Sequence, residues 1–281
     1  MKNRMDERIY TGYREIDSFT GGIGKDDLYV LVFGPEGRKE GHLWNIIKNV
    51  ADQGKRILYI NLINSTGLSY IPPESHKNVI NETGLIPGVI DIGRSCRKHK
   101  DIDLIVINSL DLIWQRSSYY KRDNVCYQLK CLAKNIHTPI MVSNLSDGLY
   151  RRANLLRICI SSGIQEEGRK FVDYLILFYL PESYYSNHYK DKDTVTELEA
   201  RIVNFHTLKE KIVHMIYSEV TGEIREYTPR VYGLLCKAKT LGLDTKDAIT
   251  FAFYWENREL PEDNLKKTDI NMKDNEGWVL T

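Results

Sequence analysis

The chain of 281 residues lacks the features that announce a membrane protein, a secreted protein or a general nucleic-acid binder. No apolar run approaches the roughly 20 residues that a membrane-spanning helix needs, and the opening MKNRMDERIY is too polar for a signal peptide. With 39 Lys and Arg against 38 Asp and Glu, the net charge is +1, so any nucleic-acid surface must be local. These absences predict a soluble, cytoplasmic protein without a membrane partner.

Cysteine is also scarce and unpatterned. The five cysteines form no C-x-x-C pair, and Cys126 and Cys131 fall within one expected helix. This spacing favours reduced, mostly buried thiols over a zinc site or a disulfide framework. A chain of this length buries a proper core as one large domain, alone or with an appendage.

Apolar, β-branched runs recur between helical stretches along the first two thirds of the chain. Near-continuous apolar strands that alternate with helices predict an α/β fold, with a mainly parallel sheet covered by helices on both faces. The helices are expected at residues 41–52 and 126–136. The strands are expected at residues 28–33, 56–62, 104–108, 139–143 and 174–179.

The last third of the chain changes in character. Two neighbouring apolar segments predict an antiparallel finish to the sheet, and two amphipathic helices follow the Thr228-Pro229 step. We expect residues 1–227 to form the main domain and residues 228–281 to form a short helical, partly disordered C-terminal extension. The antiparallel segments are residues 198–204 and 211–217, and the helices are residues 230–242 and 245–255.

Residues 28–45, LYVLVFGPEGRKEGHLWN, suggest a strand, a glycine-bearing loop and the start of a helix. A nucleotide-binding P-loop has the pattern G-x-x-x-x-G-K-[ST], whose N–H groups surround phosphates while its lysine reaches the β/γ oxygens and its hydroxyl holds magnesium. Here Lys39 takes the lysine position, but Phe33 and Arg38 replace the glycines and Glu40 replaces the hydroxyl. The candidate nucleotide-loop residues are Gly34, Gly37, Arg38, Lys39 and Glu40.

Residues 11–41, TGYREIDSFTGGIGKDDLYVLVFGPEGRKEG, closely resemble the opening of the RecA-like motor domain of DnaB-type replicative helicases. The family's linker, T-G-[FY]-x-x-[IL]-D-x-x-T-G-G, is matched from Thr11 to Gly22, and the resemblance continues over residues 9–227. It implies a RecA-like P-loop NTPase fold, ATP and magnesium as cofactors, and single-stranded DNA as a partner. It also implies a homo-oligomeric ring or an active helicase partner. A KaiC-type ATPase is disfavoured by the Thr20-Gly21-Gly22 opening and by the Tyr184-Tyr185 region.

The same resemblance implies that the family's catalytic positions are replaced. Asn108 falls on the Walker B aspartate, Ile63 on the catalytic glutamate, and His206 on the arginine finger. Such a finger alone is worth roughly 10³ to 10⁵ in turnover. The joint loss predicts a DNA- or partner-binding pseudoenzyme of DNA replication or of a mobile element. The alternative is a diverged but active DNA-dependent ATPase that uses Glu40 or Asp111, the latter expected in a loop beyond the strand, as a substitute ligand.

Two basic clusters fall in regions that resemble the DNA-contacting loops of the family. In a ring, such loops face the central channel and contact phosphates without reading bases. The competing interpretation is that short basic runs are solvated surface. The candidate nucleic-acid contacts are Arg116, Lys121 and Arg122 in the first region and Arg151, Arg152 and Arg157 in the second.

Overall fold

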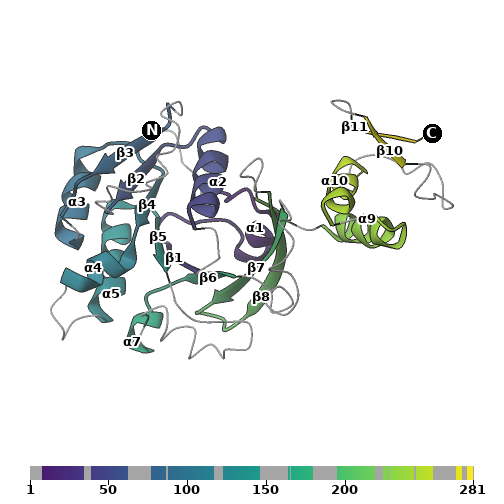
Figure 1. The fold of residues 1–281 in the computed structure, drawn as a ribbon. Coiled ribbons are helices and arrows are strands. Elements are labelled where there is room, and N and C mark those ends of the chain that lie inside the picture. The colour runs from purple at the N-terminus through teal and green to yellow at the C-terminus, as the bar shows by residue number, and fades with distance from the viewer. Residues whose placement is uncertain are drawn as a thin grey trace. The chain divides into compact units, whose positions relative to one another are not determined.

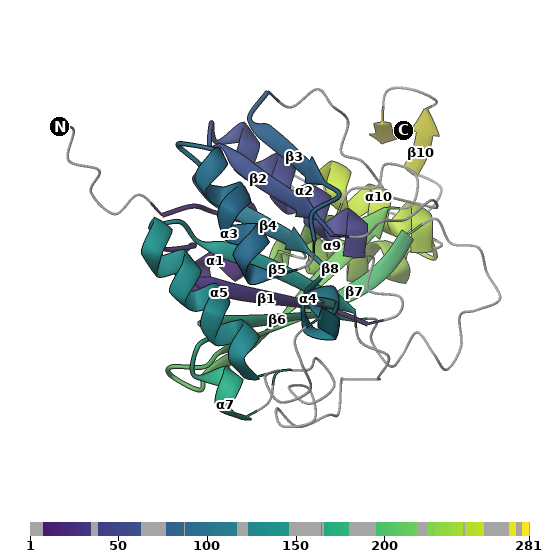
Figure 2. The same ribbon diagram turned by 90° about the vertical axis from the view of Figure 1, so that its left-hand side faces the viewer.

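The structure is a computed structural model, whose elements are labelled in Figures 1 and 2. The chain divides into two compact units. The first consists of Met1–Ser183 and Leu198–Val213, and the second consists of Tyr184–Glu197 and His214–Thr281. The first unit contains every candidate site residue that the structure describes. The described residues are 8–34, 39–62, 77–86, 88–116, 123–145, 164, 166–179, 195–218, 224–226, 228–243, 245–255, 270–273 and 277–280.

Nine strands form one sheet in the order β3-β2-β4-β5-β1-β6-β7-β8-β9. Strands β3, β2, β4, β5, β1 and β6 run parallel to one another, and β7 is antiparallel to β6. The predicted mainly parallel sheet with an antiparallel finish is therefore confirmed. The strands are β1 Leu28–Phe33, β2 Ile57–Asn61, β3 Val79–Thr83, β4 Leu104–Asn108, β5 Ile140–Leu145, β6 Tyr174–Tyr179, β7 Val195–Asn204, β8 Glu210–Ser218 and β9 Ile224–Glu226.

Helices cover both faces of this sheet, as Figures 1 and 2 show. Helices α3 (Val89–Lys98), α4 (Leu110–Arg116) and α5 (Asp123–Ile136) lie on one face, and α1 (Arg14–Thr20) and α2 (Lys39–Asp52) lie on the other. Because both faces are covered, the central strands have no side for polar residues, and β1 and β4 are buried throughout.

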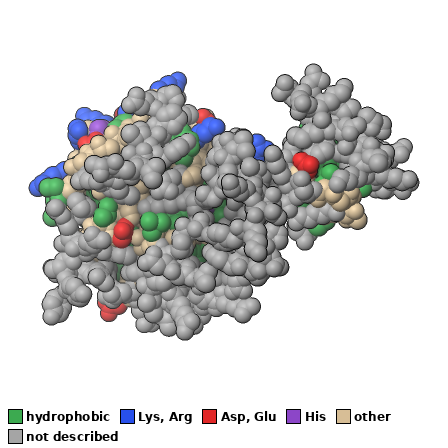
Figure 3. All heavy atoms as spheres, viewed as in Figure 1, with side chains coloured by type: hydrophobic (Ala, Val, Ile, Leu, Met, Phe, Trp, Pro, Cys, Tyr) green, Lys and Arg blue, Asp and Glu red, His purple; other side chains and the backbone are tan. Residues whose placement is uncertain are grey.

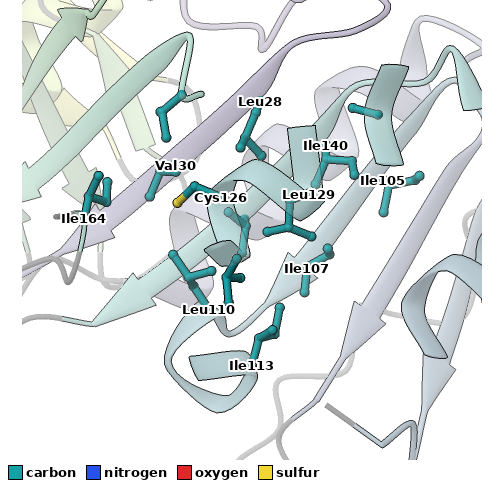
Figure 4. Packing of buried hydrophobic residues seen from close by; sticks show 14 of the residues in the cluster. Leu28, Val30, Ile105, Ile107, Leu110, Ile113, Cys126, Leu129, Ile140 and Ile164 are labelled. Carbon is teal, nitrogen blue, oxygen red and sulfur yellow. The ribbon is translucent and has the colours of Figure 1, made fainter. Parts of the chain in front are cut away.

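The main core lies between α5 and the sheet (Figure 4). Leu129 on α5 is fully buried, and Figure 4 shows it beside Ile107 and Ile140 on the neighbouring strands. Each fully buried aliphatic side chain of this kind stabilises the fold by about 1.5–3 kcal/mol. This layer holds the ends of the strands, and therefore the candidate site, in fixed register.

The segment before α1 runs tightly along α2. Asn49 Nδ2 donates to the carbonyl of Thr11 (3.1 Å), and Gln53 Nε2 donates to the carbonyl of Tyr10 (2.7 Å). Gly12 has φ +87°, and a Cβ added there would lie 2.2 Å from Asn49 Nδ2. Only glycine accepts both this left-handed backbone and this close approach, so the sequence Thr11-Gly12-Tyr13 fixes the linker against the helix.

The second unit has its own small core. Helices α9 (Pro229–Thr240) and α10 (Thr245–Trp255) pack through apolar faces, and β10 (Ile270–Lys273) pairs antiparallel with β11 (Gly277–Leu280). The sequence predicts the two helices but not this hairpin. The buried residues of the two helices are Val231, Leu234, Leu235, Ala238, Ala248, Phe251, Ala252 and Trp255. Within the described segments, every helix is too short or too polar to span a bilayer.

Candidate functional site at the carboxyl edge of the sheet

The carboxyl ends of the parallel strands bring three polar residues into one row. Asn61 at the end of β2 pairs in register with Asn108 at the end of β4, which pairs with Ser143 on β5. All three side chains are buried. Ligands of open α/β sheets bind just outside this edge, so the row marks the place where a nucleotide-binding relative would carry its chemistry.

Both the nitrogen and the oxygen of the Asn108 side-chain amide form hydrogen bonds within the protein. Its Nδ2 donates to the hydroxyl of Tyr59 (3.2 Å), and its Oδ1 accepts from Ser143 Oγ (3.0 Å). The residue is only 4% exposed. A buried amide with both partners in place is a structural link between β2, β4 and β5. It offers neither the charge nor the open oxygen of a carboxylate that holds magnesium.

Asp111 is a carboxylate that follows Asn108 closely in the sequence. It lies in the first turn of α4, so the expectation that it belongs to a loop is wrong, because the helix already begins at Leu110. Its Oδ1 accepts a hydrogen bond from Ser109 Oγ. Among the described residues, no group of three His, Cys, Asp or Glu is placed to hold a metal ion. The Asn108 position therefore lacks a carboxylate for magnesium, and Asp111 is a carboxylate that flanks it.

The end of β1 is built as core. Phe33, at the position of the first P-loop glycine, is fully buried, and its ring stacks on Phe178 with 5.1 Å between centroids. Gly34 follows, and its N–H donates to the carbonyl of Phe178 (2.9 Å). Gly37 and Arg38 lie outside the described residues. Lys39 and Glu40 begin α2, and their side chains also lie outside the description.

A histidine that the sequence reasoning missed lies beside this aromatic pair. His42 on α2 is fully buried, and its ring centroid lies 3.9 Å from that of Phe178. Its Nδ1 is 3.3 Å from the Tyr13 hydroxyl, whereas Nε2 has no hydrogen-bond partner within the described part of the chain. Burial lowers the pKa of His42 to about 3, so the imidazole is neutral. The signal was its place four residues before Ile46 on the apolar face of α2.

The opposite, amino edge of the sheet contains a buried ionic network. Asp173 Oδ2 accepts from the Leu28 N–H (2.6 Å) and from Lys130 Nζ (2.5 Å), and Asp173 Oδ1 is paired with His206 Nε2 (2.8 Å). His206 follows β7, whose end pairs with the start of β6. Within this chain His206 is therefore a partner of Asp173 at the edge away from Asn108.

Two adjoining pockets also open at the amino edge. Their volumes are about 310 Å³ and about 260 Å³, and both are lined by Lys25, Ile102 and His137. Neither pocket includes Asn108 or Gly34. Both pockets lie at the opposite edge from Asn108. The candidate site at the carboxyl edge is therefore identified by its position in the fold.

Charged side chains gather elsewhere on the surface. Figure 3 shows Lys and Arg along the side of the molecule where β3 and α3 lie in Figure 1. There Glu82 contacts Lys98 Nζ (3.1 Å) and His99 Nε2 (2.7 Å). Burial raises the pKa of Glu82, but the hydrogen bonds from His99 and Lys98 outweigh it and lower the pKa overall. The Glu82 carboxylate therefore already has two partners within the protein, Lys98 and His99.

The remaining predicted residues fall outside what the structure describes. Arg116 is the last residue of α4, and its side chain lies outside the description. The replaced catalytic position Ile63 also lies outside the described residues. The same holds for the predicted DNA contacts Lys121, Arg122, Arg151, Arg152 and Arg157.

Together, the parallel order β2-β4-β5-β1-β6, the helices on both faces and the succession of β1 and α2 define a RecA-like ATPase-domain fold. Solved structures agree. A DnaB-like replicative helicase, studied for its interactions with primase, matches with a TM-score of 0.61 at 14% identity over 80% of this chain. The match spans 65% of that helicase chain.

Two shorter proteins match over nearly their whole length. A separately solved ATPase domain has a TM-score of 0.61 at 13% identity, covering 81% of this chain and 94% of its own. A KaiC-like protein from Pyrococcus horikoshii OT3 has a TM-score of 0.55 at 15% identity, covering 80% and 100%. No family model and no curated protein matches the sequence. At these identities, the likeness shows the fold alone.

Proposed function

We propose that this chain is a helicase-like protein that binds single-stranded DNA or a partner subunit and hydrolyses ATP weakly or not at all. The observation that carries the proposal is the Asn108 amide, which is closed off by Tyr59 and Ser143 at the position where the fold needs a magnesium carboxylate. Catalysis of phosphoryl transfer depends on positioned charge more than on covalent chemistry. A neutral, internally bonded row supplies little of that charge.

The phosphate-binding loop supports the same proposal. Phe33 belongs to the core, so the first glycine of the loop pattern has no counterpart that wraps a phosphate. By their positions in the loop pattern, Glu36 and Glu40 would add negative charge near a bound phosphate. Two unit charges 4 Å apart repel by about 4 kcal/mol at an effective dielectric of about 20. Arg38 and Lys39 offset that repulsion only in part.

The second candidate is a diverged but active DNA-dependent ATPase. The observation in its favour is the Ser109–Asp111 pair, which sets a hydroxyl and a carboxylate just beyond the end of β4. Magnesium in P-loop enzymes is held by one hydroxyl and one carboxylate, so Asp111 is the residue on which this candidate depends.

Partners are part of the proposal. One matched helicase is described with primase, and a role in DNA replication, of a host or of a mobile element, is proposed here by that likeness. The subunit partner is either further copies of this chain in a ring or an active helicase that supplies the hydrolysis. Both assemblies leave DNA contact to the basic regions around Arg116 and Arg151.

The test separates binding from turnover. Mg–ATP and single-stranded DNA are titrated separately, and hydrolysis is measured with and without DNA. We expect DNA binding, and turnover at least roughly 10³-fold below a typical enzyme rate of about 10 s⁻¹. DNA-stimulated hydrolysis that Lys39→Ala abolishes would contradict the proposal. Loss of that hydrolysis in Asp111→Asn would establish the second candidate.

A further inference from the structure

Helix α7 (Glu166–Arg169) ends in an arginine, Arg169, whose guanidinium has two nitrogens without a hydrogen-bond partner among the described residues. The helix packs against the first part of α5, because a Cβ added at Gly168 would lie 3.9 Å from the side chain of Cys126. Figures 1 and 2 both place α7 beside one end of α5. The helix is therefore anchored to the core rather than carried on a loop.

The guanidinium of Arg169 is buried on one edge without an acceptor among the described residues. Its Nε and Nη2 are both shielded from water, and neither has a hydrogen-bond partner there. Buried cations are normally paired, since a charge without a partner is strongly unfavourable away from water. These two nitrogens form the edge of a guanidinium that binds two oxygens of a carboxylate or phosphate at once.

Glu167 on the same helix does not supply the missing partner. It is exposed and lies two positions from Arg169, and residues two apart on a helix do not face each other. Arg169 as a whole keeps part of its surface exposed. A rotation of its long side chain would bring the unpaired edge to solvent, where an anion would supply both missing hydrogen bonds.

The neighbours of Arg169 complete a mixed basic and aromatic surface. Lys170 is exposed, with its Nζ 5.2 Å from the centroid of the Phe171 ring. Tyr127 on α5 lies 4.9 Å from Phe171, centroid to centroid, and is 46% exposed. Proteins that bind single strands combine cations for the backbone with exposed aromatic rings on which bases stack.

We propose that Arg169, Lys170 and Tyr127 form a phosphate-binding site for single-stranded DNA, with Arg169 on a backbone phosphate and the Tyr127 ring against a base. The proposal rests on the DNA binding proposed above and adds a site outside the two predicted basic regions. It places the contact on a helix that packs on the core, so the backbone of the site is held in place and binding needs only a change in the Arg169 side chain.

The experiment compares Arg169→Met, Tyr127→Ala and the control Lys48→Ala, which removes an exposed lysine of α2. Fluorescence anisotropy measures binding of a labelled oligothymidylate at several salt concentrations. We expect Arg169→Met to weaken binding about 10-fold and to reduce the slope of log K against log salt by about 0.7, the value for one phosphate on a single strand. Tyr127→Ala should weaken binding roughly 5-fold or more with the slope unchanged. Lys48→Ala should bind like the wild type.

A thermal-shift arm separates this site from the proposed function. Arg169→Met should unfold at or above the wild-type temperature, because it removes an unpaired buried charge. If the wild type binds DNA and Arg169→Met keeps its affinity and slope, the site is overturned and the proposed function stands. If the wild type does not bind DNA, the DNA-binding part of the proposed function fails. Pyrophosphate stabilisation lost in Arg169→Met would then support a free-phosphate site, and its absence would overturn the site.

Discussion

The two edges of the parallel sheet contrast in charge. At the carboxyl edge, where nucleotide chemistry would occur, the strand ends carry the neutral row Asn61, Asn108 and Ser143. At the amino edge, Asp173 and Lys130 form a buried ion pair that a backbone N–H also joins. The buried charge that the fold retains is structural. The buried ion pair thus lies away from the edge at which ligands bind in open α/β sheets.

Two histidines show the same contrast. His42, at the carboxyl edge, is fully buried among aromatic rings and neutral. His206, at the amino edge, is 57% exposed and contacts the Asp173 carboxylate. The first therefore acts as an aromatic filler and the second as a surface partner of a buried charge.

Removing Asp173 should have the largest effect. In Asp173→Ala, Lys130, with only 13% of its side chain exposed, loses its carboxylate. Breaking a buried ion pair from one side destabilises a protein by about 3–5 kcal/mol, and urea denaturation measures the loss. The control is Glu210→Ala, whose carboxylate is 51% exposed opposite Arg201 and should be worth under about 1 kcal/mol. Equal losses would erase the contrast between buried and surface charge.

Replacing His42 by Phe tests the contrast between the two histidines through the pH dependence of the free energy of unfolding. Because burial holds the pKa of His42 near 3, below its ordinary 6.5, only the unfolded chain binds this proton between those values. Stability is therefore full above about pH 6.5 and falls with acid towards pH 3. From pH 7.5 to 5.0 the wild type should lose about 2 kcal/mol more than His42→Phe. Parallel pH profiles in urea denaturation would show that His42 takes up its proton while folded.

The smallest effect is expected in the turn that carries His206. Leu208 is 72% exposed and has φ +56°, a backbone conformation that disfavours any side chain with a Cβ. Leu208→Gly removes this strain and should raise the free energy of unfolding by up to about 1 kcal/mol. Thermal denaturation measures the change. A lower melting temperature would mean that the exposed leucine makes a contact that stabilises the turn.

The strands that could be predicted from the sequence are those with continuous apolar runs. The bounds of β1, β4 and β6 agree with the prediction, because each apolar run is buried over almost its whole length and directly follows an aspartate. Strand β3 was not predicted from the sequence, because it is an edge strand whose residues are half-buried or exposed. Its sequence, VINET, carries neither a period of two nor a continuous apolar run.

The site was predictable in place but not in its contacts. Parallel strands put Asn108 at the carboxyl edge, yet its partners Tyr59 and Ser143 depend on strand register, which one sequence does not reveal. Lys130 and His206 lie 43 and 33 residues from Asp173 in the chain. Tertiary packing alone brings such groups together, so no local spacing could have signalled this network.

The clamp between the linker and α2 has a mechanical consequence. Tyr10 and Thr11 are tied to Gln53 and Asn49, near the far end of the helix that begins at Lys39. A pull on the chain ahead of Tyr10 is therefore transmitted to the carboxyl-terminal end of α2 through these two hydrogen bonds.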